Sequence, residues 1–353
     1  LLLCNGEYSS MITVSGSGYS KKNDTMLYRW KGNSTSDDSG MFFYIKNLNS
    51  NDYWSSTYEP CKDSGEKYLV ELNLDKAKFS RRDGNIETVT EVAVSTEENF
   101  EVRKLILKNN GDKGRSIEIT SYMEITLATF SADIVHPAFS NLFIQTEYDK
   151  EEDILVGSRR PRVKDGKVPY IFHKAVVKGE LEGGISYETS RINFIGRNRE
   201  LKNPQAMDND KALDNTVGTV LDPIMSVRVR VRLEPNSKRE IFYITGICDS
   251  KEQVLNLCRE YKNPGKLDKV FEGYSTATQL ELKNLGIRSG MANIFQSVAS
   301  NIFFLSNSRK NREEYIKNIS KHQKDLWPYG ISGDLPIAML IIEAEEDMHL
   351  VFN

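Results

Sequence analysis

The sequence that decides the fold is a run of glycines and aromatic residues near the start of the chain: GSGYS at 16–20, LYRW at 27–30 and GMFFYI at 40–45. Glycines at positions 16 and 18 permit backbone angles that are closed to other residues, and they let a second chain segment approach closely. Aromatic and β-branched runs between such glycines are typical of short strands joined at hairpin corners. The stretch therefore predicts β-structure.

The aromatic residues of this stretch also suit a second role. Tyr19 and Trp30 have flat apolar faces with a polar edge, which is the chemistry that a pyranose ring prefers. An ordinary hairpin corner accounts for the same residues, so both interpretations stay open. Trp30 follows Leu27, Tyr28 and Arg29 in a strand-like run, and we expect it to pack between sheets and to matter more to folding than to binding.

Strand-like runs recur from Tyr8 to about Gly246 and are separated by turns such as NNGD at 109–112 and Asp165-Gly166. The clearest strand is 226–233, where apolar residues alternate with arginines at 228, 230 and 232. We expect one packed face and one face in water. A region of about 240 residues with strands throughout is longer than a seven-strand sandwich needs. It therefore predicts two large antiparallel sheets packed face to face.

The periodicity changes to that of a helix after Asp249. A first helix is broken by Asn263-Pro264-Gly265, and a longer one is expected from about Leu267 to Leu285. A third lies between Gly290 and Ser308, and we expect its apolar stripe to dock on the sandwich or on a following domain. The stripe consists of Met291, Ile294, Phe295, Val298, Ile302 and Leu305. The polar stretch 199–214 is predicted to be a loop.

Composition excludes several classes of protein. The 353 residues are 39% hydrophobic, and 47 basic against 50 acidic residues leave a net charge of −3. That charge gives no general attraction to nucleic acid or to an anionic membrane. No window has eighteen uninterrupted apolar residues, so we expect no membrane contact from this segment. The chain starts Leu-Leu-Leu-Cys without Met and ends in the apolar residues 350–352, so we expect both ends to be cuts in a larger protein.

The cysteines and histidines predict no metal and no disulfide. Cys4, Cys61, Cys248 and Cys258 lack CxxC spacing, and we interpret them as free thiols in a reducing, cytoplasmic compartment. Any membrane anchor would lie in other segments of the parent protein. The four histidines are scattered, and none stands four residues from another, as a helical zinc pair requires.

No independent catalytic centre is predicted. The chain has no GxSxG, Walker A, HExxH or EF-hand pattern, which argues against serine hydrolases, nucleotide hydrolases, zincins and calcium-loop proteins. Asp334 stands in SGDLP at 332–336, where Gly and Pro bracket it in a turn, and turn or helix capping explains it better than catalysis.

Two polar clusters are candidates for binding. Arg159, Arg160 and Arg162 surround Pro161 and can present guanidinium groups to phosphate or to sugar hydroxyls. The alternative is pairing with carboxylates such as Glu151 and Glu152. In HPAF at 136–139 the peptide bond before Pro137 forces an extended turn that would fix the directions of the His136 and Phe139 side chains. The alternative interpretation is a corner that serves packing alone.

Longer blocks of the chain resemble a known family. Residues 1–30, LLLCNGEYSSMITVSGSGYSKKNDTMLYRW, resemble the opening of the large β-sandwich in the inverting disaccharide phosphorylases, which include cellobiose and chitobiose phosphorylases. Four further blocks, in order, resemble the cyclic β-1,2-glucan synthases and β-1,2-oligoglucan phosphorylases within it: HPAFSNLF at 136–143, SRRPR at 158–162, NTVGTVLDP at 215–223 and YGISGDLPI at 329–337.

The resemblance implies a mainly β fold with C-terminal helices, namely a large two-sheet antiparallel supersandwich followed by a helical linker. The family's catalytic module adds an (α/α)6 barrel that carries the general-acid Asp. This chain stops at Asn353, so it resembles the first, non-catalytic copy of the sandwich. The predicted divisions are the supersandwich at 1–248, the linker at 249–325 and the start of a further segment at 326–353.

The leading functional hypothesis is therefore a sandwich domain without catalytic residues that binds or positions β-glucan within a glucan synthase or glycoside phosphorylase. The alternatives are the N-terminal part of a catalytic inverting phosphorylase whose barrel is missing, and a purely structural or dimerisation sandwich. The implied partners are β-glucan or oligosaccharide, the remaining domains of the parent and a homodimer. No cofactor is expected, and inorganic phosphate would serve only the parent enzyme. The predicted carbohydrate-binding residues are Tyr19, His136, Phe139, Arg159 and Arg160.

Overall fold

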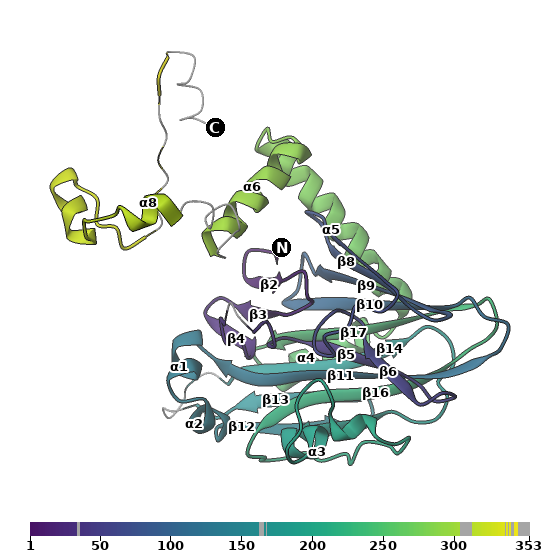
Figure 1. Cartoon of the computed structure of the whole chain (residues 1–353). Helices are drawn as coiled ribbons and strands as arrows, with labels where there is room; N and C mark the ends of the chain where they lie inside the picture. The colour runs from purple at the N-terminus through teal and green to yellow at the C-terminus, as the bar shows by residue number, and fades with distance from the viewer. Residues whose placement is uncertain are drawn as a thin grey trace. The chain divides into compact units, whose positions relative to one another are not determined.

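The computed structural model describes residues 1–33, 36–161, 166, 168–303, 313–335, 337, 339 and 342–344. The chain divides into two compact units, Leu1–Asn293 and Ile294–Asn353. The first unit contains two antiparallel sheets in two layers (Figure 1). Several residues singled out in the sequence lie outside the described residues: Arg162, Asp165, Leu305, Ser308, Pro336, His349 and 350–352.

One sheet has nine strands. Its hydrogen bonds follow the order β1-β2-β3-β4-β11-β16-β15, and β5 pairs with both β11 and β6. The long strand β11 therefore joins two groups of strands from the first third of the chain to β16. The strands are β1 (Leu2–Cys4), β2 (Tyr8–Ile12), β3 (Gly18–Lys22), β4 (Thr25–Tyr28), β5 (Phe42–Asn47), β6 (Asp52–Ser55), β11 (Arg115–Ala128), β15 (Ser186–Ser190) and β16 (Pro223–Leu233).

The other sheet has eight strands in the order β12-β13-β14-β17-β10-β9-β8-β7, all antiparallel to their neighbours. They are β7 (Lys67–Leu72), β8 (Ala77–Asp83), β9 (Ile86–Val94), β10 (Phe100–Asn109), β12 (Ile144–Asp149), β13 (Ile154–Arg159), β14 (Tyr170–Val177) and β17 (Lys238–Cys248). The predicted pair of large antiparallel sheets is confirmed.

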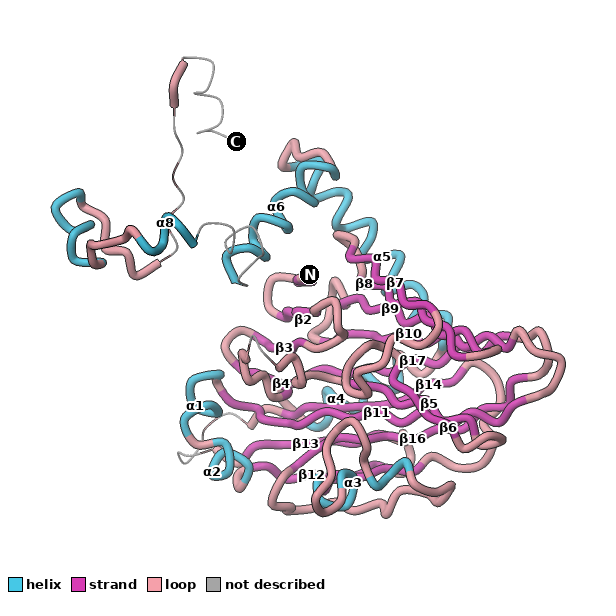
Figure 2. Tube along the Cα trace, viewed as in Figure 1, coloured by secondary structure: helices cyan, strands magenta, loops and turns pink. Residues whose placement is uncertain are grey.

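Helices occur in some of the connections between strands and after the last strand (Figure 2). Short helices α1 (Phe130–Val135), α2 (Pro137–Asn141) and α3 (Arg191–Ile195) and the 3-10 turn η1 (Gln205–Met207) lie between strands. After the last strand come α4 (Lys251–Glu260), α5 (Pro264–Asn284), α6 (Ser289–Phe303), α8 (Glu313–Lys317) and η2 (Gln323–Tyr329).

The main core lies between the sheets. Val227, Val229 and Val231 of β16 are buried there, in one cluster with Leu105 of β10 and Tyr243 of β17. Alternate residues of a strand face opposite sides, so these valines share one side. The packed face predicted for residues 226–233 is confirmed.

The opposite face of β16 is only partly in water. Arg228 is 2% exposed, and its guanidinium donates to the carbonyls of Lys211 at 2.8 Å and Ala206 at 2.6 Å. These carbonyls belong to the segment after α3, whose Phe194 packs on the same face. The expectation of a wet face is therefore wrong for Arg228, because a loop folds over it, and it holds for the exposed Arg232.

Helices α4 and α5 cover the outer face of the eight-stranded sheet. Val254 and Leu267 join a second apolar cluster with Phe100 and Val102 of β10. The helix break predicted at 263–265 is observed: the Asn263 side chain accepts from the Gly265 N–H at 2.8 Å, and Pro264 occupies the first turn of α5. Proline fits there because the first helical N–H groups have no intrahelical partner.

The glycines at 16 and 18 are explained by packing. Gly16 and Gly18 both have positive φ, and a Cβ at either position would collide with Thr57 or with the Met11 carbonyl. Gly18 begins β3 beside β2, so glycine is needed for the close approach of two strands. These two residues therefore serve the hairpin corner.

The apolar stripe of α6 spans the boundary between the two units. Met291 is 40% and Ile294 61% exposed, and the side chain of Ile302 is not described. By contrast Leu267, Val270 and Tyr274 of α5 are buried. The predicted docking of the helical segment is therefore confirmed for the start of α5, whereas docking of the α6 stripe, which lies mostly in the second unit, stays a prediction.

A pair of substitutions on α5 tests this division. We expect Leu267→Ala to lower the free energy of unfolding by about 2 kcal/mol, because it leaves a cavity against the sheet. Leu280→Ala on the same helix is the matched control, since Leu280 is 57% exposed, and it should change stability by less than about 0.5 kcal/mol. Urea denaturation of both variants measures the difference; equal losses would mean that the whole helix contributes to packing.

Candidate functional site

A pocket opens where β4 and β11 meet the short helices α1, α2 and α3. Its volume is about 360 Å³, within the range of ligand pockets, roughly 300–1,000 Å³. Three basic, three acidic and three apolar residues line it, namely Arg29, Lys31, Arg191, Glu124, Asp133, Asp222, Trp30, Ile134 and Pro137. A mixed lining of this kind suits a polar ligand with apolar faces.

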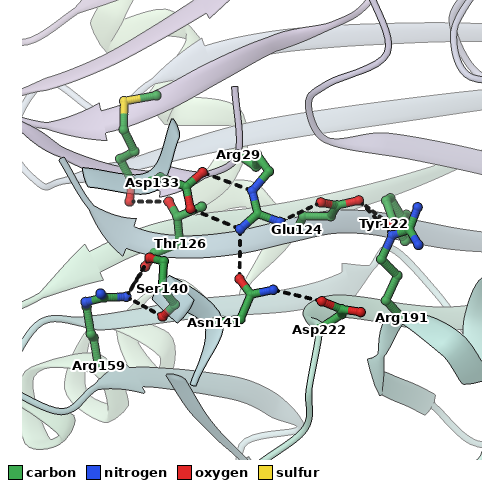
Figure 3. A network of polar contacts seen from close by, with 11 residues as sticks. Arg29, Tyr122, Glu124, Thr126, Asp133, Ser140, Asn141, Arg159, Arg191 and Asp222 are labelled. Carbon is green, nitrogen blue, oxygen red and sulfur yellow. Dashed lines mark hydrogen bonds and ion pairs between the residues drawn. The ribbon is translucent and has the colours of Figure 1, made fainter. Parts of the chain in front are cut away.

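Arg29 is the centre of the polar wall (Figure 3). Its Nε and Nη2 donate to the two carboxylate oxygens of Asp133 at 2.9 and 3.0 Å, and its Nη1 donates to Glu124 at 3.0 Å. Nη2 also donates to the Asn141 side chain at 2.8 Å. A bidentate guanidinium–carboxylate pair fixes both groups in one plane. The wall is therefore rigid before any ligand arrives.

Glu124 links Arg29 to Arg191. Its second oxygen accepts from the Tyr122 hydroxyl and from the Arg191 Nε, both at 3.0 Å. Burial acts to raise the pKa of Glu124, but Arg29 and Arg191 outweigh it and hold the pKa below the usual range. Glu124 is therefore ionised at neutral pH.

Asn141 carries the network to the far side of the pocket. This buried amide accepts from Arg29 and donates from Nδ2 to one oxygen of Asp222 at 2.9 Å. The backbone N–H of Arg191 donates to the Asp222 carbonyl at 3.0 Å. Asp222 and Arg191 therefore start from neighbouring backbone positions at the pocket (Figure 3).

Aromatic residues lie at the edge of the pocket. Trp30 lines it and meets Tyr19 edge to face, with ring centroids 5.8 Å apart. Both side chains are half-buried. The expectation that Trp30 packs between the sheets is therefore wrong. Trp30 directly follows Arg29, whose side chain is held by Asp133 of α1. Tyr19 of the predicted set thus lies beside a residue of the pocket.

His136 and Phe139 lie close in the chain to Pro137, which lines the pocket. His136 is the residue between α1 and α2, and Pro137, next to it, lines the pocket. His136 and Phe139 are exposed, and the Phe139 ring packs edge to face on Phe143. The structure places these two predicted residues next to the pocket without a direct role in its wall.

The arginines of the predicted set behave differently. Arg159 is buried and donates to the Thr126 and Ser140 carbonyls at 3.1 and 2.9 Å, so its guanidinium holds α2 against β11. Arg160 is exposed and donates to the Leu142 carbonyl at 3.3 Å. Glu152, one of the carboxylates considered as a partner for these arginines, contacts Arg259 at 2.9 Å.

Most of the wall was not singled out from the sequence. Its polar residues come from separate places in the chain, and no sequence motif links them: Arg29, Glu124, Asp133, Asn141, Arg191 and Asp222. The available signals were indirect: Arg29 lies in the LYRW run, and Asn141 and Asp222 lie in the family blocks at 136–143 and 215–223.

Other chemistry is not evident in the described part of the chain. No group of three or more His, Cys, Asp and Glu residues there is placed to hold a metal ion. The four cysteines are free, and three of them are buried. Asp334 accepts from the Gln323 side chain at 2.8 Å within an exposed turn. None of the described helices is both long enough and apolar enough to span a bilayer.

Comparison with known proteins identifies the fold around this pocket. Residues 1–264 match the family described as "Glycosyl hydrolase 94, supersandwich domain". The chain belongs to this family. The supersandwich described above is therefore a family architecture, and the pocket lies within the matched residues.

The relatives are much longer than this chain. A cyclic beta-(1,2)-glucan synthase, NdvB of Rhizobium meliloti (strain 1021), is 33% identical over 99% of this chain, which covers 12% of that protein. An N,N'-diacetylchitobiose phosphorylase of Vibrio proteolyticus is 23% identical over 75% of this chain and 32% of its own length. A bacterial glucoamylase complexed with acarbose matches 81% of this chain and 38% of its own, with 11% identity and a TM-score of 0.50. That likeness shows the fold alone.

Proposed function

We propose that this supersandwich binds and positions a short segment of β-linked glucan, or a related oligosaccharide, within a larger carbohydrate enzyme. The observation that carries the proposal is the pocket of about 360 Å³ with its mixed lining. The Trp30 ring offers an apolar face for a sugar, and the charged wall offers hydrogen bonds for hydroxyl groups. A glucan synthase and a phosphorylase among the relatives support this class of ligand.

The charged wall favours binding over catalysis. Cleavage of a glycosidic bond needs a carboxylic acid that keeps its proton near neutral pH. The pKa of Glu124 is instead lowered, and both Asp133 oxygens accept from Arg29. We therefore expect the chain alone to have no phosphorylase activity, and the catalytic group to lie elsewhere in the parent protein.

The proposal extends to the domain divisions of the chain and to the location of the parent protein. The proposed divisions are the sandwich at 1–248, the linker at 249–325 and the segment from 326 onward, and we propose that the parent protein lies in the cytoplasm. A contribution of this pocket's rim to the active site of the parent, and a purely structural or dimerisation role, are the alternatives. Glucan binding that involves Trp30 separates the leading proposal from a purely structural role.

Titration calorimetry with linear β-1,2-glucan tests the function directly. We expect a dissociation constant between about 10 μM and 1 mM, roughly 4 to 7 kcal/mol of binding free energy, because hydroxyl groups exchange water for protein with little net gain. Dextran should bind more weakly, and neither sugar should yield glucose 1-phosphate with inorganic phosphate.

A substitution at Trp30 assigns the binding to the pocket. Trp30→Ala should weaken glucan binding roughly tenfold, since a stacked aromatic face is lost. Tyr58→Ala is the control, because Tyr58 is an exposed aromatic residue that does not line the pocket. Equal heats for the two sugars, or no heat with either, would favour the structural role.

A further inference from the structure

We infer that the pocket selects an uncharged sugar, and that Asp222 and Arg191 are the two groups that contact its hydroxyls. This inference deepens the proposed function and rests on it. It concerns two residues that were not singled out from the sequence, and it states which chemical class of glycan the pocket excludes.

Charge balance argues for an uncharged ligand. The pocket carries three basic and three acidic residues, and the acidic ones lie close to any group that would enter. Arg29, the central cation, already donates to Asp133, Glu124 and Asn141. The other two cations are also paired, Lys31 with Asp38 at 3.5 Å and Arg191 with Glu124 at 3.0 Å. An anionic substituent would therefore meet carboxylates and only cations that are already ion-paired, whereas a neutral ring bears no such cost.

Hydrogen-bonding capacity remains on two residues. One oxygen of Asp222 accepts from Asn141 at 2.9 Å, and the other has no partner in the described part of the chain. Arg191 uses its Nε on Glu124 at 3.0 Å, and a guanidinium has further N–H donors on its terminal amines. Its side chain is 39% exposed. One residue thus supplies an acceptor and the other supplies donors.

Both groups are held in place before binding. The amide of Asn141 is buried and fixes Asp222, while Glu124 fixes Arg191. Preorganised groups lose little conformational entropy when a ligand binds. Neighbouring hydroxyls of a pyranose each donate and accept, so an adjacent carboxylate oxygen and guanidinium match them, with Trp30 and Pro137 left for the C–H faces.

Binding selectivity is the measurement that tests this. The probes are a linear β-1,2-glucan oligosaccharide and its carboxymethylated derivative, titrated into the full chain. The wild-type protein should bind the neutral probe at least about tenfold more tightly. Asp222→Asn keeps an oxygen for Asn141 and removes one negative charge. It should weaken the neutral probe roughly tenfold, as for a lost charge-assisted hydrogen bond, and should narrow or reverse the preference.

Arg191→Gln and a remote control complete the design. Arg191→Gln should weaken the neutral probe by a similar factor and increase the discrimination against the anionic probe, because a positive charge is lost. Arg232→Gln changes an exposed arginine of β16 and should behave as wild type. A narrowed preference in Asp222→Asn with an unchanged melting temperature separates ligand contact from a folding role.

The outcomes distinguish the two proposals. If Asp222→Asn and Arg232→Gln both bind the neutral probe as tightly as the wild-type protein does, the proposed function stands and this inference is overturned. Tighter binding of the anionic probe to the wild-type protein also overturns it. Wild-type protein that binds neither probe removes the proposed function itself.

Discussion

Arg103→Met is expected to lower the free energy of unfolding by about 3 to 5 kcal/mol. Arg103 and Glu101 are 5% and 0% exposed between the two sheets. Glu101 accepts from Ser10, Ser20 and Tyr28 at 2.9 to 3.1 Å. The guanidinium of Arg103 provides the only described positive charge beside it, at 3.4 Å.

The physical reason is an uncompensated charge. Arg103 also donates to the Met41 carbonyl at 2.7 Å and to the Tyr28 hydroxyl at 3.1 Å, so its removal strands acceptors as well. Burial acts to lower the pKa of Arg103, but Glu101 outweighs it and the pKa is raised. Loss of the cation leaves the Glu101 carboxylate buried without a counter-ion. A buried carboxylate without a counter-ion has a large desolvation cost, which lowers the stability of the folded state.

Two further variants test that reason. In Glu101→Gln/Arg103→Met the charge is absent from both sides, so we expect a smaller loss than in Arg103→Met alone. Arg82→Met is the matched control, because Arg82 is an exposed arginine at 3.7 Å from Glu66, and it should change stability by less than about 1 kcal/mol. The measurement is urea denaturation followed by circular dichroism. A double variant that loses as much as Arg103→Met would contradict the charge argument.

The second large effect is a loss of stability in acid through His173. This buried ring lies between the Ser121 and Thr245 hydroxyls, both at 2.7 Å. Burial, with a contribution from Arg103, lowers its pKa from 6.5 to about 3. The neutral ring can satisfy both hydroxyls, whereas the cation is disfavoured in the core.

The sign follows from which state binds more protons. Between pH 6.5 and about 3 the unfolded chain takes up a proton that the folded chain refuses, so stability falls as the pH falls. The stabilisation is complete above pH 6.5. We expect His173 to account for about 3 kcal/mol of loss between pH 7 and pH 4, and for roughly 4 to 5 kcal/mol in total.

His173→Gln isolates this contribution from that of the carboxylates. We expect the variant to be less stable at pH 7, because a buried hydrogen bond is impaired. Its stability should then decline less steeply in acid, so the gap to the wild-type protein closes toward pH 4. Parallel pH profiles of the two proteins would show that His173 is not the group that titrates.

The sequence alone was sufficient for the architecture. Alternation at 226–233 predicted the packed face of β16, and the break at 263–265 predicted the boundary between α4 and α5. Both are local signals, because a strand alternates every second residue and a helix is stopped or started by its own caps. The length of the β-region then required large sheets.

None of the residues predicted to bind carbohydrate lines the pocket, and their role in binding stays a prediction. Tyr19 contacts the pocket residue Trp30 and His136 adjoins the pocket residue Pro137, while Arg159 is buried against α2. The wall itself joins residues from 29 to 222 through hydrogen bonds across several strands and helices. No local sequence pattern predicts that these residues come together, because their proximity depends on which strands pair and where those strands end.

Burial of charge was likewise decided by the tertiary structure. In β10, Glu101 and Arg103 share the inward face with Leu105 and Leu107, although the alternation of Phe100 and Val102 also suggests an apolar face. Near the start of β10 both faces of the strand are covered, one by the nine-stranded sheet and the other by α4 and α5. The sequence determines which residues of a strand point the same way, but what covers each face depends on distant segments. That is why the fold, and not the pocket or the buried charges, could be derived from the chain itself.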